Sequence, residues 1–112
     1  MKRIYIAIFI ALAVGVTTTQ AADLAKAKAN YNLLCKGCHG VDGKGDTLLG
    51  QKLDVKNFTD LKVQEKLKDD QMFKSIKEGL KKGGKTLMRP YGERLGDQEI
   101  KDLVAYIREF KK

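Results

Sequence analysis

The chain has 112 residues and carries 22 Lys and Arg against 14 Asp and Glu, for a formal net charge of +8. This length fits a single domain. Only two cysteines and one histidine are present, which leaves a zinc site of about four ligands without its second pair of side chains. The lysines are not concentrated on one expected helix face, which argues against nucleic-acid binding despite the charge.

Residues 1–22 follow the three-part pattern of a cleaved secretory signal. Two basic residues precede an apolar run over residues 4–16, and small residues suited to signal peptidase follow it. The run is shorter than the ~20 apolar residues of a membrane span, so an uncleaved anchor is the less favoured interpretation. We expect cleavage after Ala21 or Ala22, a mature domain of residues 23–112 in the periplasm, and no stable membrane insertion after cleavage.

Four segments of the mature chain have the composition and spacing of helices. Residues 23–34 are rich in Ala, Lys and Leu, which are good helix formers, and Asp23 suits the N-cap. Two further helices are expected over residues 58–67 and 69–80. Residues 97–110 show the strongest pattern, with apolar residues at i, i+3, i+4 and i+7 and acidic residues in the first turn, as the helix dipole favours.

Two glycine-rich stretches, residues 37–55 and 81–96, are expected to be irregular loops. No segment alternates polar and apolar residues as a half-buried strand does, so the sequence predicts an all-α class. Loops of this length are uncommon in a compact domain unless they serve a function. We therefore expect the two loops to enclose something.

The segment Cys35-Lys36-Gly37-Cys38-His39 matches the C-x-x-C-H pattern of covalent haem attachment. Two thiols at this spacing can form thioether bonds to the vinyl groups on one haem edge, and the histidine that follows can ligate the iron. The alternative is a local disulfide, structural or redox-active, but the βαβ context of thioredoxin-like sites is not predicted here. The motif therefore predicts one haem c held by Cys35 and Cys38 and ligated by His39.

The second axial ligand is sought among three methionines. Met1 is lost with the signal, and Met72 lies on the apolar face of an expected helix, where core packing is its simpler role. Met88 lies in a loop that contains glycine and proline, from which its thioether could reach the iron opposite His39. We expect Met88 to be the ligand, with Met72 as the less favoured candidate. Ligation by Met and His fills both axial positions and raises the reduction potential.

With these residues identified, the mature chain resembles the small bacterial class I monohaem cytochromes c, from the helix before Cys35 to Phe110. Met88 occupies the place of that family's distal ligand, and a proline soon after it, here Pro90, is common there. The segment 95–106 is similar to the family's last helix. The resemblance implies a cytochrome c-like fold of three to five helices, with long loops wrapped around one covalently attached haem.

The resemblance also implies how parts of the chain pack. The last helix crosses the first, and the residues expected at this crossing are Ala27, Tyr31, Leu103 and Tyr106; the family often has glycine at the place of Ala27. The family usually has a proline after the motif, whose carbonyl accepts a hydrogen bond from Nδ1 of the proximal histidine. The segment 46–50 has no proline, so another backbone carbonyl of this segment, near Leu48, is expected to take the role.

A mature chain of about 90 residues builds only a marginal core by itself, and the apolar haem macrocycle would complete it. The residues expected to line the haem are Leu34, Leu48, Leu49, Leu53, Phe58, Phe73, Ile76, Leu87 and Tyr91. We predict that the chain is largely unfolded without haem.

These features predict an exported electron carrier and not an enzyme. A haem with both axial positions filled suits the transfer of single electrons to and from redox partner proteins, in transient encounters of a monomer. Lysines in or beside the haem-wrapping segments could steer acidic partners, namely Lys36, Lys44, Lys52, Lys56, Lys81, Lys82 and Lys85. The alternative is a haem enzyme or sensor whose labile sixth position binds a gas or a peroxide. A non-haem disulfide carrier is a third hypothesis.

Overall fold

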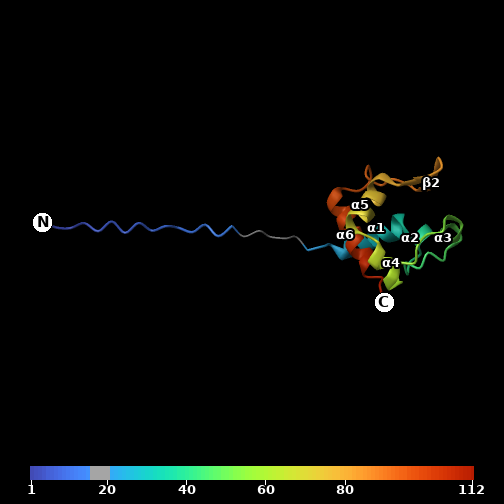
Figure 1. Ribbon diagram of the computed structural model, residues 1–112, viewed down its shortest axis with the longest axis horizontal. Coiled ribbons are helices and arrows are strands. Elements are labelled where there is room, and N and C mark those ends of the chain that lie inside the picture. Colours follow the sequence, from blue (N-terminus) through green and yellow to red (C-terminus); the bar gives the residue numbers. More distant parts are fainter. Residues whose placement is uncertain (16–20) are drawn as a thin grey trace.

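The computed structural model describes residues 1–15 and 21–112. Residues 1–15 have no regular secondary structure and extend away from the folded body (Figure 1). Within the described ranges, no helix is both long enough and apolar enough to cross a membrane. The expected signal includes residues 16–20, which lie outside the described residues, and the expected cleavage after Ala21 or Ala22 stays a prediction.

The folded body is mostly helical, and over the described residues it has six helices and one two-stranded antiparallel sheet. In chain order the elements are α1 (Leu24–Leu34), α2 (Lys36–His39), α3 (Leu48–Leu53), α4 (Leu61–Lys66), α5 (Asp69–Glu78), β1 (Leu80–Lys82), β2 (Lys85–Met88) and α6 (Asp97–Arg108). All four expected helices are present, with ends that differ from the expected ones by up to three residues.

Two features of the fold correct the all-α prediction of three to five helices. The short helices α2 and α3 lie within the glycine-rich stretch that was expected to be a loop. The stretch after α5 forms the hairpin β1–β2, in which Gly83 and Gly84 make the turn with φ of 57° and 77°. The sequence showed no alternation there because the strands have three and four residues, and all but Leu87 and Met88 are exposed.

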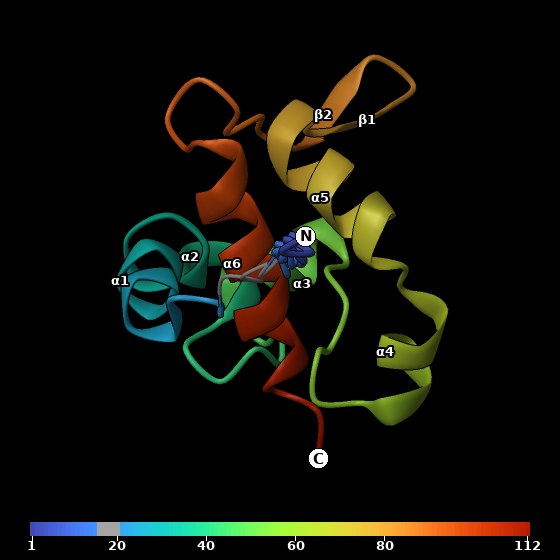
Figure 2. The same cartoon turned by 90° about the vertical axis from the view of Figure 1, so that its left-hand side faces the viewer.

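The predicted crossing of the first and last helices is confirmed, and α1 lies against α6 in the view of Figure 2. Ala27 and Tyr31 of α1 and Leu103 of α6 are 1%, 0% and 0% exposed. The rings of Tyr31 and Tyr106 lie 5.2 Å apart between centroids, at an angle of 53°. This crossing forms the centre of the core, whose buried apolar residues are Ala27, Tyr31, Phe58, Met72, Ile76, Leu95, Ile100, Leu103, Val104 and Ile107.

Side-chain caps fix the beginnings of α1 and α6 and tie the two helices together. The carboxylate of Asp23 accepts a hydrogen bond from the backbone N–H of Lys26 at 3.0 Å, which confirms the predicted N-cap. Glu99 accepts from the backbone N–H of Gly96 at 3.2 Å and from the side-chain amide of Asn30 at 3.2 Å. These two bonds, the one from Gly96 above all, lower the pKa of Glu99, so its carboxylate is charged at neutral pH.

Arg108, at the end of α6, holds the connection between α4 and α5. Its guanidinium donates to the backbone carbonyl of Gln64 at 2.7 Å, to that of Leu67 at 2.6 Å and to the carboxylate of Asp69 at 2.7 Å. The buried Gln64 side chain in turn donates to the carbonyls of Phe58 and Ile107. Since these carbonyls lie inside the fold, the network satisfies backbone groups that would otherwise be costly to bury.

Candidate functional site

The motif residues Cys35, Cys38 and His39 lie at the junction between α1 and α2. Backbone bonds continue across this junction, from the N–H of Cys35 to the carbonyl of Tyr31 at 2.8 Å and from the N–H of His39 to the carbonyl of Cys35 at 3.0 Å. Residues three and four positions apart in a helical turn share a face. The chain therefore brings both thiols and the imidazole to one side of a short helical segment.

Cys35 and Cys38 are both half-buried, and both are free thiols. Burial raises the pKa of the Cys35 thiol to about 11, with a further contribution from Cys38, so Cys35 is protonated at neutral pH. Redox-active C-x-x-C sites depend on a thiol whose pKa is lowered. The surroundings of Cys35 therefore disfavour the disulfide-carrier alternative.

His39 is half-buried, and its ring stacks on the ring of Phe58 with centroids 4.9 Å apart and planes 20° apart. Its Nδ1 atom is buried and has no hydrogen-bond partner among the described residues. The expected bond from Nδ1 to a carbonyl of residues 46–50 is therefore not formed in this structure. Burial also lowers the pKa of His39, which keeps the imidazole neutral, the form that ligates a metal ion.

The segment after the motif folds back onto it through backbone contacts. The hydroxyl of Thr47 donates to the carbonyl of Cys38 at 2.9 Å and accepts from the N–H of Gly50 at 2.9 Å. A Cβ atom at Gly50 would collide with the carbonyl oxygens of Cys38 and Gly45. Only glycine at position 50 allows α3 to approach the motif this closely.

Met88 ends β2 and is half-buried against the core, opposite Leu80 of β1. The chain that follows is fastened to two helices. The backbone N–H of Tyr91 donates to the carbonyl of Ile76 near the end of α5 at 2.9 Å, and its hydroxyl donates to the carbonyl of Leu34 at 3.1 Å. The hydroxyl of Tyr91 thereby links the Met88 segment to the residue that precedes the motif.

Met72, the less favoured ligand candidate, is 6% exposed and belongs to the hydrophobic core on α5. Core packing therefore accounts for it. Among the described residues, no group of three or more His, Cys, Asp and Glu side chains is arranged to hold a metal ion.

Comparison with known proteins adds an independent line of evidence. Residues 22–107 match the family model described as cytochrome c oxidase, cbb3-type, subunit III. The chain is 33% identical over 73 residues to cytochrome c-554(548) of Halomonas halodenitrificans, an alignment that covers 64% of this chain and 78% of that protein. The chain belongs to the class I c-type cytochromes.

Solved structures agree with this assignment. The fold of the cytochrome matches that of the KustC0563 c-type cytochrome with a TM-score of 0.68 and 38% identity, covering 77% of this chain and 98% of that one. A point mutant of the same protein matches with a TM-score of 0.66 and 36% identity, covering 77% and 99%. Because these matches span nearly the whole of the other chains, the cytochrome c fold is shown for the body of this chain.

The residues of the cytochrome fit a covalently bound haem. Two unpaired thiols lie one helical turn apart, and a neutral imidazole, the form that ligates a metal ion, follows them. Apolar and aromatic side chains expected to line the haem lie at the edge of the core, among them Leu34, Phe73 and Tyr91. Phe58, which stacks on His39, was expected to line the haem, but its contact with His39 was missed because the two residues lie 19 positions apart in sequence.

Proposed function

We propose that this cytochrome is an exported monohaem electron carrier. Cys35 and Cys38 hold one haem c through two thioether bonds, and His39 and Met88 are the axial ligands of its iron. The mature domain is residues 23–112, located in the periplasm as a monomer. Its partners are redox proteins that it meets transiently.

The observation that carries the proposal is the junction of α1 and α2. It presents two free thiols and a neutral imidazole on one helical segment of a c-type cytochrome fold. Iron would coordinate Nε2, the ring nitrogen other than Nδ1, and thioether bonds would account for the two half-buried thiols.

When bound, haem supplies an iron that takes up and releases one electron. The protein determines what else the site can do. The backbone at the junction holds both thiols and His39 along one edge, and the bonds of Tyr91 to α5 and α1 hold the Met88 segment beside it. A thioether and an imidazole on the iron leave no position for a substrate, which favours a carrier over the alternative of a gas- or peroxide-binding enzyme.

Optical spectroscopy of the purified protein tests this proposal. We expect a covalently attached chromophore that stays with the chain in a denaturing gel, reversible spectral changes on reduction and oxidation, and the far-red charge-transfer band of methionine–iron ligation in the ferric state. A colourless protein, or one whose chromophore is lost on denaturation, would contradict covalent attachment. A missing far-red band would support the enzyme or sensor alternative.

Replacing the two candidate methionines separates their roles. We predict that Met88→Ala abolishes the charge-transfer band, lowers the reduction potential and lets the ferric protein bind cyanide. Met72→Ala serves as the control. It should keep the band and cost about 2–5 kcal/mol of unfolding free energy, because it removes a buried core side chain. The opposite pattern, with the band lost only in Met72→Ala, would transfer the ligand role to Met72.

A further inference from the structure

Acidic residues are distributed unevenly among the basic residues of the sequence. The segment 80–91 contains four basic residues and no acidic one, namely Lys81, Lys82, Lys85 and Arg89. The segment 35–56, which includes the motif and α3, also has four lysines but interleaves them with Asp42, Asp46 and Asp54. The two segments hold equal numbers of basic residues, but acidic residues offset the positive charge in only one of them.

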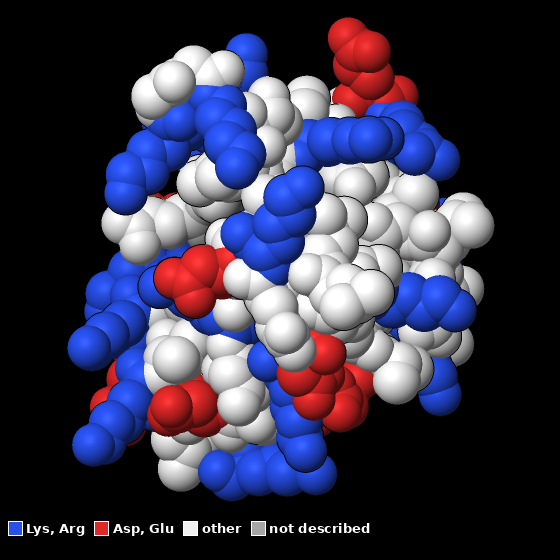
Figure 3. All heavy atoms as spheres, turned by 90° about the vertical axis from the view of Figure 1, so that its right-hand side faces the viewer, with Lys and Arg blue, Asp and Glu red and all other residues white. Residues whose placement is uncertain are grey.

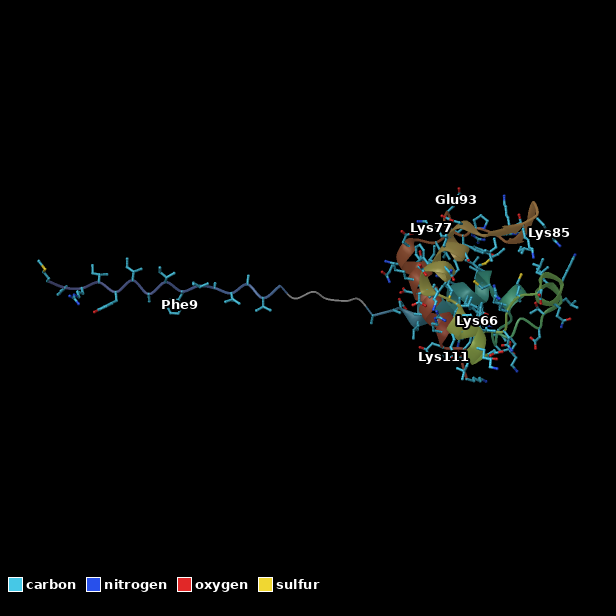
Figure 4. The ribbon with its side chains drawn as sticks, viewed as in Figure 1. Phe9, Lys66, Lys77, Lys85, Glu93 and Lys111 are labelled. Carbon is cyan, nitrogen blue, oxygen red and sulfur yellow. The ribbon has the colours of Figure 1, made fainter. Side chains whose placement is uncertain are left out.

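The structure places the unbalanced lysines on the β1–β2 hairpin. Lys81, Lys82 and Lys85 are exposed, and Lys85 lies at the far end of the hairpin, while Lys77 and Glu93 lie near its base (Figure 4). The ion pairs found among the described residues are Lys26–Glu99, Lys74–Glu78, Lys77–Asp97 and Arg108–Asp69. None of these pairs neutralises a hairpin lysine.

The face of the molecule that carries the hairpin shows the same contrast. Blue Lys and Arg side chains spread over the upper part of this face, where red side chains lie only at the upper right, whereas more red side chains lie among the blue ones lower down (Figure 3). Figure 1 places the hairpin and the α2–α3 segment at the same end of the folded body. The positive potential is therefore displaced toward the hairpin side of the motif.

Within the hairpin, the strand register sets like charges against each other. Lys82 of β1 pairs directly with Lys85 of β2 beside the Gly83–Gly84 turn. Like charges directly opposite each other destabilise a strand pair, so this arrangement does not serve the stability of the isolated protein. An acidic surface laid against the hairpin would remove that repulsion.

The hairpin also reaches the candidate iron ligand. Leu80 of β1 is 46% exposed and pairs across the hairpin with Met88 of β2, which packs against the core. The same two strands thus carry charged side chains, one exposed apolar side chain and Met88 itself. A partner seated on the hairpin would lie close to the proposed axial ligand.

We propose that the Leu80–Met88 hairpin is the docking surface for an acidic redox protein, in place of a ring of lysines all around the motif. This inference rests on the proposed function and names the partner chemistry and the side of approach. A protein suits the hairpin better than a membrane, because Leu80 is its one large apolar side chain that is strongly exposed. Peripheral membrane segments bury a face of several large apolar residues.

Two variants of equal charge test the location. The hairpin variant is Lys81→Gln/Lys82→Gln/Lys85→Gln, and the matched control is Lys44→Gln/Lys52→Gln/Lys56→Gln in the segment that has interleaved acids. The rate of electron transfer to an acidic blue-copper protein is followed by stopped-flow absorbance at low and high ionic strength. Steering by a local charge patch raises association rates by about 10-fold or more at low salt.

We expect the hairpin variant to lose about 10-fold in rate at low ionic strength and most of its salt dependence, while the control loses less than about twofold. A charge-preserving variant, Lys81→Arg/Lys82→Arg/Lys85→Arg, should keep the wild-type rate. The hairpin glutamine variant should be no less stable than the wild type, since Lys82 and Lys85 repel each other. Equal losses in both glutamine variants, or none in the hairpin variant, would overturn the proposal.

Two further measurements isolate the inference. Sedimentation with phosphatidylglycerol vesicles, against phosphatidylcholine vesicles as reference, tests the membrane directly; binding that needs the hairpin lysines, together with an unchanged protein rate, would overturn the proposal in favour of a lipid surface. Reduction of every variant by ascorbate checks the haem itself. If ascorbate reduces the hairpin glutamine variant normally and its rate of electron transfer to the blue-copper protein equals that of the wild type, the docking surface alone is refuted. If ascorbate reduces no haem in the wild type, the proposed function itself is refuted.

Discussion

Tyr31 connects the hydrophobic core to the C-x-x-C-H motif. Its ring is fully buried and lies 5.2 Å from the rings of both Tyr106 and Phe110. Its hydroxyl donates to the carbonyl of Gly40, the residue after His39, at 2.6 Å. Burial raises the pKa of Tyr31, so the hydroxyl stays protonated and remains a donor. The turn that follows the candidate ligand is therefore held by a core side chain.

We predict that Tyr31→Phe costs about 0.5–1.5 kcal/mol of unfolding free energy, the net contribution of one hydrogen bond. The cost is limited because the Gly40 carbonyl keeps its bond from the N–H of Gly43 at 3.1 Å. Urea unfolding of the haem-bound protein measures the change. The control is Tyr106→Phe, which removes a hydroxyl without a hydrogen bond among the described residues and should change stability by less than about 0.5 kcal/mol. Equal effects of the two substitutions would contradict this role of Tyr31.

At the residue scale, the sequence locates the candidate site residues but not the contacts around them. Cys35, Cys38 and His39 are adjacent in the chain, and a local pattern suffices to find them. The stacking of Phe58 on His39 and the bond from Tyr91 to Leu34 join residues 19 and 57 positions apart. No local pattern encodes such pairs, because their meeting depends on how α3, α5 and the hairpin pack.

The end of α5 and the Met88 segment approach each other so closely that only glycine fits between them. Gly79 ends α5 with φ of 77° and ψ of −178°, a backbone region that is essentially restricted to glycine. A Cβ atom there would lie 2.6 Å from the carbonyl oxygen of Met88 and 2.9 Å from the nitrogen of Pro90. The position of Met88 therefore depends on the absence of a side chain at residue 79.

Comparing two alanine substitutions separates backbone strain from this collision. Gly79→Ala should cost about 2–4 kcal/mol of unfolding free energy and weaken the methionine–iron band, because the Met88 segment must move. Gly83→Ala is the control, since its φ is also positive, at 57°, but nothing lies within 4 Å of the added Cβ. It should cost about 1–2 kcal/mol for the left-handed backbone and keep the band. A band unaffected by Gly79→Ala would show that this contact does not position Met88.

The sequence predicted the helices whose hydrophobic pattern is long, and it missed the hairpin, whose strands are short. α6 has apolar residues at helical spacing over 12 residues, and α5 has 10 residues with its glycine stop at Gly79, so both were predicted. The hairpin is too short and too exposed to show alternation, yet a Gly-Gly pair between two short runs is a known hairpin signal. Gly83 and Gly84 carry that signal, but they lie in residues 81–96, which were expected to form an irregular loop.

For the whole molecule, the core is concentrated at the crossing of α1, α5 and α6 and is small. Ten of the described apolar residues are buried. Of the residues expected to line the haem, Phe58 and Ile76 are among these ten, whereas Leu48 is 91% exposed and Leu49 is 46% exposed. Each large apolar side chain contributes about 1.5–3 kcal/mol when it is fully buried. In a body of this size, the contacts that haem would add are a large share of the stability.

The final prediction concerns removal of the cofactor from the whole chain. The variant Cys35→Ala/Cys38→Ala cannot form thioether bonds, and we expect it to be largely unfolded when prepared without haem. The reason is that a domain this small buries too little apolar surface to offset the conformational entropy lost on folding. Far-UV circular dichroism measures the helicity, with the haem-bound wild type as reference. Adding free haem should restore much of the helicity, because His39 remains available as a ligand. Native-like helicity before haem is added would show that the crossing of α1, α5 and α6 suffices for folding.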